Sequence, residues 1–279
     1  MSAFAVKGTA ETPGVPPGGP VKGLPWAVLR LHRAALVVWG AFMLAALGAL
    51  VWEVGINADS VRDRMAACGH DPSLCRIRVV VDYGGTIGGA STLVYYSFFA
   101  VAAFAGGALI GRELENGTAQ LAWTQSVSPT RWLAATLAVP AVLLVAGGTV
   151  FVFVFRWAWA ANRDLMGDDW TFNDVFAARG PALVAYGLCG LGVGALAGVV
   201  LRRSLPALGV ACGVMYLINH NLEKHREDLW PTVASGGSGD WSHPESHYWP
   251  MHLVETGIVL GVAVLATGAA FWVLRRRTA

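Results

Sequence analysis

Charged residues are scarce in this sequence. They make up 14% of its 279 residues, whereas an ordinary soluble domain has about 25%. This scarcity excludes a soluble globule of this size, and a hydrophobic content of 55% excludes disorder for most of the chain, because disorder needs low hydrophobicity. The net charge is only +2, and the one short basic run is Arg275–Arg277, so nothing points to nucleic acid. A helical membrane protein with several spans remains.

Motifs of catalysis and secretion are also missing. The sequence has no G-x-x-x-x-G-K-S/T phosphate loop for ATP. Its first residues hold Lys7 and a Pro- and Gly-rich stretch instead of the apolar core of a signal peptide, which predicts a disordered cytoplasmic tail over residues 1–23. The run H-P-E-S-H, from His243 to His247, departs from the zinc-peptidase pattern H-E-x-x-H. We therefore expect no catalytic residue, no metal and no cofactor.

Long intervals without charge mark the membrane spans. A helix crosses the hydrocarbon core in about 20 mostly apolar residues, and six such intervals predict an all-α fold with six transmembrane helices. The fifth interval is short, so it either crosses fully or is re-entrant. The intervals cover residues 34–52, 89–111, 132–155, 180–201, 205–217 and 256–274.

Basic residues give the orientation of the spans. With both termini in the cytoplasm, the inner segments carry eleven basic and three acidic residues, and the outer segments carry nine and fifteen. The inner loops are also shorter, so their density of positive charge is higher, as the positive-inside rule requires. We predict a multi-pass protein of the plasma membrane with both termini cytoplasmic. Residues 24–33 form either a short interfacial helix or the leading end of the first span.

The outer loops hold few distinctive residues. Cys68 and Cys75 lie together in the first one, where an oxidising compartment and their spacing permit a disulfide without requiring it. The stretch Arg76–Tyr83 is rich in valine, and we expect it to be extended before the second span. Glu255, at the mouth of the sixth span, is expected to meet lipid headgroups.

The inner segment Gly111–Arg131 is too polar to lie in the membrane and too patterned for a simple turn. Asn116-Gly117 predicts a turn, and Thr118 can then cap a short helix over residues 119–126. That helix would expose apolar side chains, Leu121 and Trp123, along the membrane surface. Two interpretations stay open: a docking surface for a partner, or a connector that rests on lipid and neighbouring helices.

A family resemblance favours the docking surface. The run R-E-L-E-N-G-T-A-Q-L-A-W-T-Q-S-V-S-P-T-R-W-L, about 22 residues from Arg112, resembles the corresponding segment of ABC-2 type transporter permeases, particularly those of actinobacteria. In that family an acidic pair followed by Gly-Thr closes the second helix, a coupling helix follows, and S-x-x-R-W-L opens the third. The topology is similar over residues 24–279, which would form the permease domain. Relatives often carry Lys near Ala135, so Arg131 alone would supply the basic contact.

The resemblance implies the transmembrane permease subunit of an ATP-driven exporter. A separate ABC ATPase would bind the coupling segment, residues 111–131, and a homodimer or heterodimer of permeases would enclose a path for a small molecule, drug or lipid. The chain itself would not be an enzyme. The predicted contact with the ATPase combines the residues implied by the resemblance with the apolar residues of the short helix. These residues are Arg112, Glu113, Glu115, Gly117, Thr118, Leu121, Trp123 and Arg131.

Two alternatives from other classes stay open. Ser91 and His220 could form an intramembrane serine protease, although Thr92 stands where the G-x-S-G pattern of that class needs Gly. A membrane anchor or sensor without transport would need no ATPase partner. The substrate and the composition of the permease dimer do not follow from the sequence.

Overall fold

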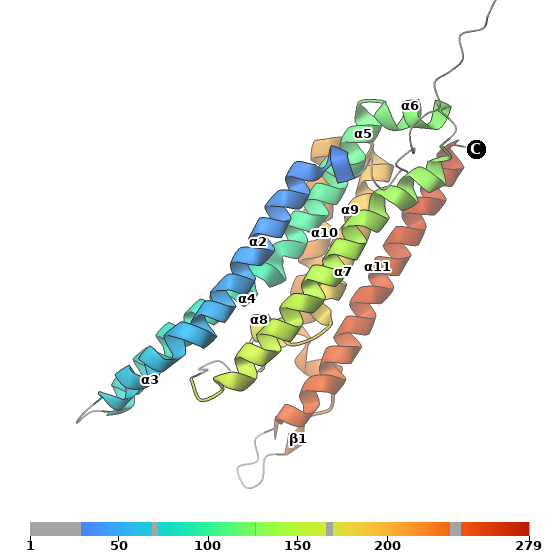
Figure 1. The fold of residues 1–279 in the computed structure, drawn as a ribbon. Helices are drawn as coiled ribbons and strands as arrows, with labels where there is room; N and C mark the ends of the chain where they lie inside the picture. Colours follow the sequence, from blue (N-terminus) through green and yellow to red (C-terminus); the bar gives the residue numbers. More distant parts are fainter. Residues whose placement is uncertain (1–28, 69–71, 126, 166–169, 235–240, 279) are drawn as a thin grey trace, which may run out of the picture.

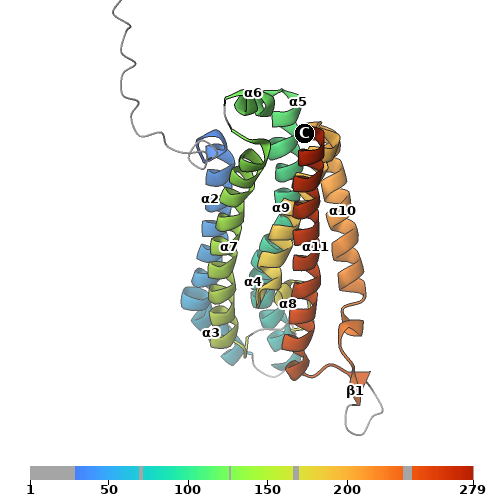
Figure 2. The ribbon, with the colours of Figure 1, turned by 90° about the vertical axis from the view of Figure 1, so that its right-hand side faces the viewer.

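Six long helices lie side by side in an elongated bundle (Figures 1 and 2). The structure is a computed structural model, and it describes residues 29–68, 72–125, 127–165, 170–234 and 241–278. Within these ranges the predicted all-α fold with six spans is confirmed. The predicted tail over residues 1–23, and residues 24–28 after it, lie outside the described residues. The helical segments long and apolar enough to cross a membrane are Arg33–Ala66, Leu74–Glu115, Pro129–Ala161, Ala182–Leu201, Ser204–Lys224 and Glu245–Thr278.

The first two spans are longer than the sequence predicts. The first consists of α2 (Arg33–Trp52), the π-helix η1 (Glu53–Asn57) and α3 (Ala58–Ala66), and the second of α4 (Pro72–Ala103), the π-helix η2 (Phe104–Gly111) and α5 (Arg112–Glu115). The prediction of an extended segment over Arg76–Tyr83 is wrong, because these residues are helical within α4. A helix pairs its own backbone groups, so the valine run needs no partner strand.

The remaining elements are four long helices and the short helices and strands that connect them. The fifth helix, α10, has 21 residues, or about 31 Å at 1.5 Å per residue, enough to cross the hydrocarbon core. The elements are α6 (Thr118–Thr124), α7 (Pro129–Ala161), α8 (Asn173–Ala178), α9 (Ala182–Leu201), α10 (Ser204–Lys224), η3 (Glu227–Leu229), β1 (Val233–Ala234), the antiparallel partner β2 (Trp241–Ser242), η4 (Glu245–His247) and α11 (Tyr248–Thr278).

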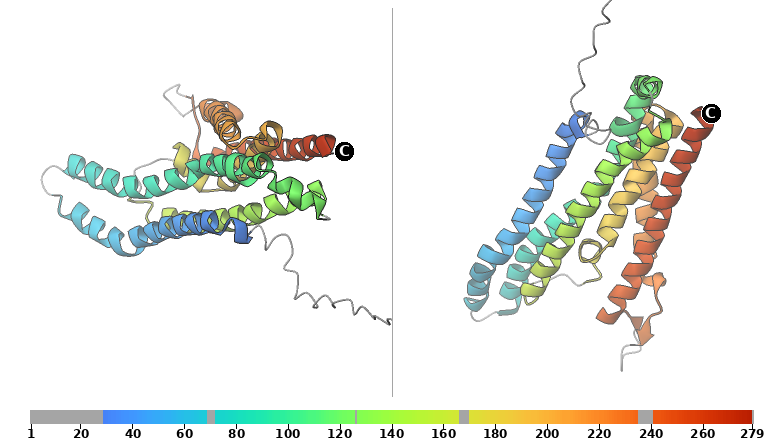
Figure 3. Two further views of the ribbon diagram at one scale, coloured as in Figure 1. Left: turned by 90° about the horizontal axis from the view of Figure 1, so that it is seen from above. Right: turned by 45° about the vertical axis from the view of Figure 1, so that its right-hand side comes forward.

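Helix α9 is the centre of the bundle (Figure 3). Within its apolar window 78% of the residues are buried, against 17% for the first span. Glycines spaced four residues apart let its neighbours approach closely. A Cβ at Gly190 would lie 2.7 Å from the Phe98 carbonyl oxygen, and one at Gly194 would lie 2.5 Å from that of Ala102. The second span therefore packs backbone to backbone on α9.

One end of the bundle gathers the inner segments that the sequence predicts. The start of α2, the helices α5 and α6 and the end of α11 all lie at this end (Figures 1 and 2). The Arg277 guanidinium donates to the carbonyl oxygens of Val199, at 3.0 Å, and Val200, at 2.9 Å, and so closes the end of α9. Helix α3 and the strand β1 lie at the opposite end (Figure 1).

Candidate functional site

The segment between α5 and α7 forms a short helix across one end of the bundle (Figure 1). Gly117 makes the turn that separates α5 from α6, with a φ of 76° that glycine adopts without strain. Thr118 does not cap α6 as predicted, because its Oγ1 donates to the Glu113 carbonyl oxygen at 3.1 Å. The helix ends at Thr124, two residues before the predicted end.

Glu113 joins this segment to two other spans. One carboxylate oxygen accepts a hydrogen bond from Trp132 Nε1 on α7 at 3.1 Å, and the other lies 3.8 Å from His32 Nε2, just before α2. The side chains of Glu113 and His32 are 14% and 12% exposed. Glu113 is therefore a partly buried junction rather than a freely solvated helix end.

Glu115 joins the segment to α10, the fifth span of the chain. Its Oε2 accepts hydrogen bonds from the backbone N–H of Ser204 at 2.8 Å and from the Ser204 hydroxyl at 2.7 Å. A carboxylate at this position satisfies a free N–H of the first turn of α10 and is stabilised by the helix dipole. These two hydrogen bonds tie the end of α5 to the start of α10.

The apolar contacts of α6 differ from the prediction in one respect. Trp123 is only partly exposed, because its ring packs edge-to-face on Trp132 with the centroids 5.8 Å apart. Leu121 is 62% exposed and presents the free apolar side chain of this helix. Arg112 and Arg131 are also exposed. The helix that follows starts where Ser128 caps it, accepting from the Arg131 N–H at 3.4 Å.

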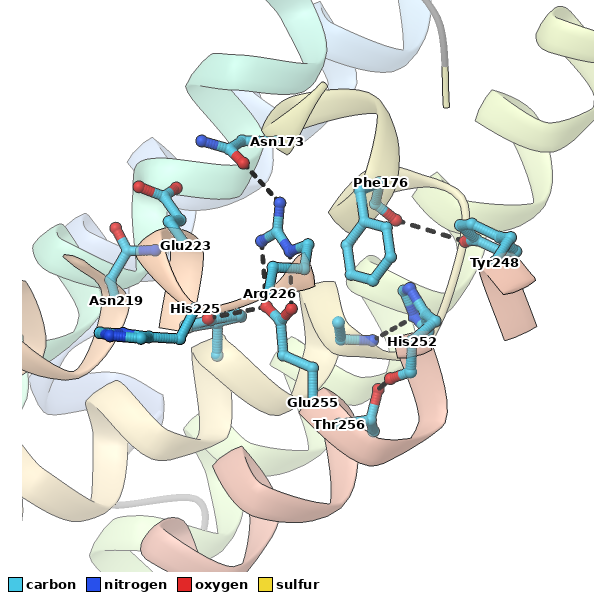
Figure 4. Close-up of polar contacts among 12 residues, drawn as sticks. Asn173, Phe176, Asn219, Glu223, His225, Arg226, Tyr248, His252, Glu255 and Thr256 are labelled. Atoms are coloured by element: carbon cyan, nitrogen blue, oxygen red, sulfur yellow. Dashed lines mark hydrogen bonds and ion pairs between the residues drawn. The ribbon is translucent and has the colours of Figure 1, made fainter. Parts of the chain in front are cut away.

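A buried polar cluster lies at the other end of the bundle (Figure 4). The Arg226 guanidinium donates to both oxygens of Glu255, from Nε at 2.8 Å and from Nη2 at 3.1 Å. Tyr186 of α9 donates to the same carboxylate at 2.9 Å. Glu255 is fully buried and Arg226 is 5% exposed. The expectation that Glu255 meets headgroups is wrong, because a cation and a hydroxyl from other elements pair with it inside the bundle.

Arg226 is held from several sides. Its Nη1 donates to Asn173, and its guanidinium lies 4.2 Å above the ring of Phe176 on α8. Burial acts against its charged form, but the hydrogen bonds and charge of Glu255 outweigh burial and raise the pKa of Arg226 above its ordinary value. The arginine therefore stays charged and ties α8 to the start of α11.

Hydrogen bonds extend this polar cluster along α10. Asn219 donates to the Tyr95 hydroxyl at 2.6 Å, and Tyr95 and Tyr96 donate to Glu223 at 3.3 and 3.1 Å. The imidazole of His252 accepts from the Ala182 N–H at 3.0 Å and so caps α9. Helix α10 continues past the predicted end of the fifth span, and α11 begins before the predicted start of the sixth. The buried partners of these polar side chains allow them to lie within the helices.

Comparison with known proteins decides the family. A model of the family described as ABC-2 membrane transporter related matches residues 36–225, more than half of the chain. This chain belongs to that family. It is an ABC-2 type permease, as the resemblance of the segment from Arg112 implies, and hence a multi-pass protein of the plasma membrane and a component of membrane transport rather than a classical enzyme. Permeases of this family typically pair with an ATPase subunit. No curated protein and no solved structure matches the chain.

The permease also contains an apolar cavity of about 530 Å³ between α2, α4 and α7. Trp39 and Phe42 line it from α2, and Leu144 lines it from α7. Leu93 of α4, which also lines it, is 65% exposed, so the cavity is accessible from the side of the bundle. Its position at membrane depth makes it suitable for an apolar ligand.

Other candidate sites of the permease are resolved as follows. Cys68 and Cys75 are joined by a disulfide. Ser91 is fully buried and donates to the Gly88 carbonyl oxygen at 2.9 Å, whereas His220 is exposed and stacks on Tyr216. This placement argues against a Ser–His dyad. In the described part of the chain, no group of three or more His, Cys, Asp or Glu side chains is placed to hold a metal.

Sequence reasoning missed three residues of this site. His32 and Trp132 both contact the Glu113 side chain, and Ser204 binds Glu115. Trp132 carries a signal, because it stands in the S-x-x-R-W-L motif that opens the third span. Ser204 and His32 carry none, since their partners are distant in the sequence.

Proposed function

We propose that this permease is the transmembrane subunit of an ATP-driven exporter, and that a separate ATPase docks on the coupling segment, residues 111–131. The observation that supports this most is the exposed Leu121 on a surface helix whose base is tied into the bundle. An apolar side chain on a surface helix is a common anchor for a partner protein. The end of the bundle that carries α6 is then cytoplasmic, and so are both termini.

The contacts of the coupling segment support a path for force. A push on α6 reaches α7 through the Trp123–Trp132 contact and through the Glu113–Trp132 hydrogen bond, and it reaches α10 through Glu115. Gly117 is the joint between α5 and α6. Arg112, Thr118 and Arg131 would complete the surface that meets the ATPase. Two permeases, identical or related, would enclose the pathway of the cargo. Alternating access would then arise from two conformations of this assembly.

The apolar cavity supports an apolar or amphiphilic cargo, such as a drug-like small molecule or a lipid. It offers about 530 Å³, within the usual range for sites of drug-sized ligands. Thr92, Tyr96 and Ser97 of one helix line it, but the hydroxyls of Tyr96 and Ser97 already donate to Glu223 and to the Val94 carbonyl oxygen. The cavity therefore offers a bound molecule mainly apolar contact.

Retention of the ATPase tests the proposal. The permease, tagged and co-expressed with a candidate ABC ATPase of the same organism, is purified in mild detergent as wild type and as Leu121→Glu. A charge at an apolar anchor is expected to lower the retained ATPase at least tenfold, the size of a hot-spot contact. Leu74→Glu is the matched control, because Leu74 is 69% exposed at the opposite end of the bundle. Loss of the ATPase from wild type, or equal retention by Leu121→Glu, contradicts the proposal.

A further inference from the structure

The first part of α4 extends beyond the region of the bundle that crosses the membrane (Figure 1). Helix α9 has 20 residues, or about 30 Å, which matches the hydrocarbon core of a bilayer. Its Gly190 packs on Phe98 of α4, and both helices run toward the end that carries α6. Ala182, at the start of α9, is eight residues before Gly190, so it is level with about residue 90 of α4. The part of α4 before that level, from Pro72, extends about 27 Å further.

An exposed ridge follows one side of this extension. Ile77 and Val81 are 59% and 61% exposed, and Gly85 and Gly89 continue the same side at intervals of four residues. Among the described residues, nothing lies within 4 Å of a Cβ added at either glycine. Val81 lies about 14 Å beyond the level of Ala182, past the hydrocarbon core. An apolar patch that faces water in this way marks a contact surface.

We propose that this ridge of Ile77, Val81, Gly85 and Gly89, which we call the α4 ridge, is the contact between two copies of the permease. Glycines four residues apart on an open helix face let a second helix approach closely and are typical of paired helices. The rows of residues four apart on two such faces interlock when the helices cross. In a two-fold dimer the same surface faces itself, so Val81 of one copy meets Val81 of the other.

The charges beside the α4 ridge also match themselves. Arg78 and Asp82 are exposed, carry opposite charges and lie four residues apart on α4. Across a two-fold axis, Arg78 of each copy can pair with Asp82 of the other, so the interface contains the same ion pair twice. A surface that is complementary to itself in shape and in charge favours a second copy as its partner. The inference rests on the proposed function in one respect, since that function requires two permeases.

Cysteine cross-linking in native membranes tests the contact. Val81→Cys, treated with a mild oxidant, is expected to run mainly as a disulfide-linked dimer on a non-reducing gel, because facing residues of paired helices come within the reach of a disulfide. Leu253→Cys is the matched control, because Leu253 is 55% exposed on α11, on the other side of the bundle (Figures 1 and 2), and it should stay monomeric. Wild type gives the background from Cys189 and Cys212, the free cysteines of the described ranges.

A steric variant tests the same surface without new cysteines. Gly85→Leu adds a side chain where one copy has open space, so the variant is expected to fold, but the added side chain keeps two ridges apart. We expect dimerisation at least about tenfold weaker than in wild type, measured by energy transfer between labelled copies in liposomes. Gly257→Leu is the matched control, because Gly257 of α11 is equally open within the described residues.

Three outcomes would overturn the inference. They are a monomeric wild type in liposomes, cross-linking of Val81→Cys no stronger than that of Leu253→Cys, and a dimer that Gly85→Leu leaves intact, which would place the contact elsewhere. Retention of the ATPase is measured separately with Leu121→Glu. Failure of the α4 ridge therefore leaves the docking of the ATPase standing, and failure of that docking leaves the dimer contact standing.

Discussion

At the scale of single residues, the ion pair between Arg226 and Glu255 is the main buried charge contact at the end of the bundle opposite α6. Both side chains are buried, and the pair is bidentate. Taking two charges out of water is expensive, and their attraction offsets that cost only while both are present. Removal of one partner therefore leaves a buried charge without compensation.

The stability of variants at this pair follows from that asymmetry. Glu255→Leu is expected to lower the free energy of unfolding by about 3–5 kcal/mol. The double variant Arg226→Met with Glu255→Leu should recover most of the loss, because the unpaired charge is then gone. Thermal unfolding of the purified permease in one detergent measures all three proteins. A double variant as unstable as the single one would show that the charge is not the cause.

At the scale of elements, α9 allows its neighbours to approach because it carries glycine where they touch it. Gly194 faces Ala102 and Ala105 of the second span, and an added Cβ would lie 2.5 Å from the Ala102 carbonyl oxygen. Contacts this short force the helices apart. Gly213 of α10, in contrast, has nothing within 4 Å of an added Cβ.

The two glycines make a matched pair of substitutions. Gly194→Ala is expected to destabilise the permease by about 1–3 kcal/mol, because overpacking shifts the backbone. Gly213→Ala should be neutral or stabilising by up to about 1 kcal/mol, since alanine favours a helix more than glycine does. Melting temperatures of both variants, measured in the same detergent, give the comparison. Equal shifts in the two would mean that close packing on α9 is not what limits substitution there.

The elements also show what the sequence can and cannot predict. The number of spans and the turn at Gly117 were predictable, because apolar length and a glycine turn are local signals. The ends of α10 and α11 were not, because buried polar residues such as Asn219 and Glu255 find their partners on other helices. The prediction that Trp123 is exposed was wrong for the same reason, because the Trp132 ring packs against it. A local pattern contains no information on such tertiary partners.

At the scale of the whole molecule, the two ends of the bundle differ in chemistry. The end with α6 carries the exposed Leu121 and the basic run Arg275–Arg277. The other end carries the disulfide and the polar cluster around Arg226 and Glu255. The positive-inside rule and the preference of disulfides for oxidising compartments agree on one orientation.

Labelling in intact cells tests this orientation. Ser60→Cys places a thiol on α3 at the end with the disulfide, and Thr124→Cys places one on α6; both positions are exposed. A membrane-impermeant maleimide is expected to label Ser60→Cys in intact cells and Thr124→Cys only after permeabilisation. Wild type gives the background from Cys189 and Cys212, the free cysteines. The reverse pattern would place α6 outside the cell, where no ATPase could reach it.

The second span is longer than the membrane is thick. Its 42 residues extend about 63 Å at 1.5 Å per residue, roughly twice the 30 Å of a hydrocarbon core. Helix α9 packs backbone to backbone on this span at Phe98 and Ala102, between the two ends of the span. If the span tilted about that contact as one body, its two ends would move in opposite directions. A swing of about 10° would displace the end at Leu74 by about 7 Å and the end at Glu115 by about 4 Å. A small displacement beside α6 would thus be felt, with its direction reversed, where Tyr83 donates to the Glu53 carbonyl oxygen at the far end.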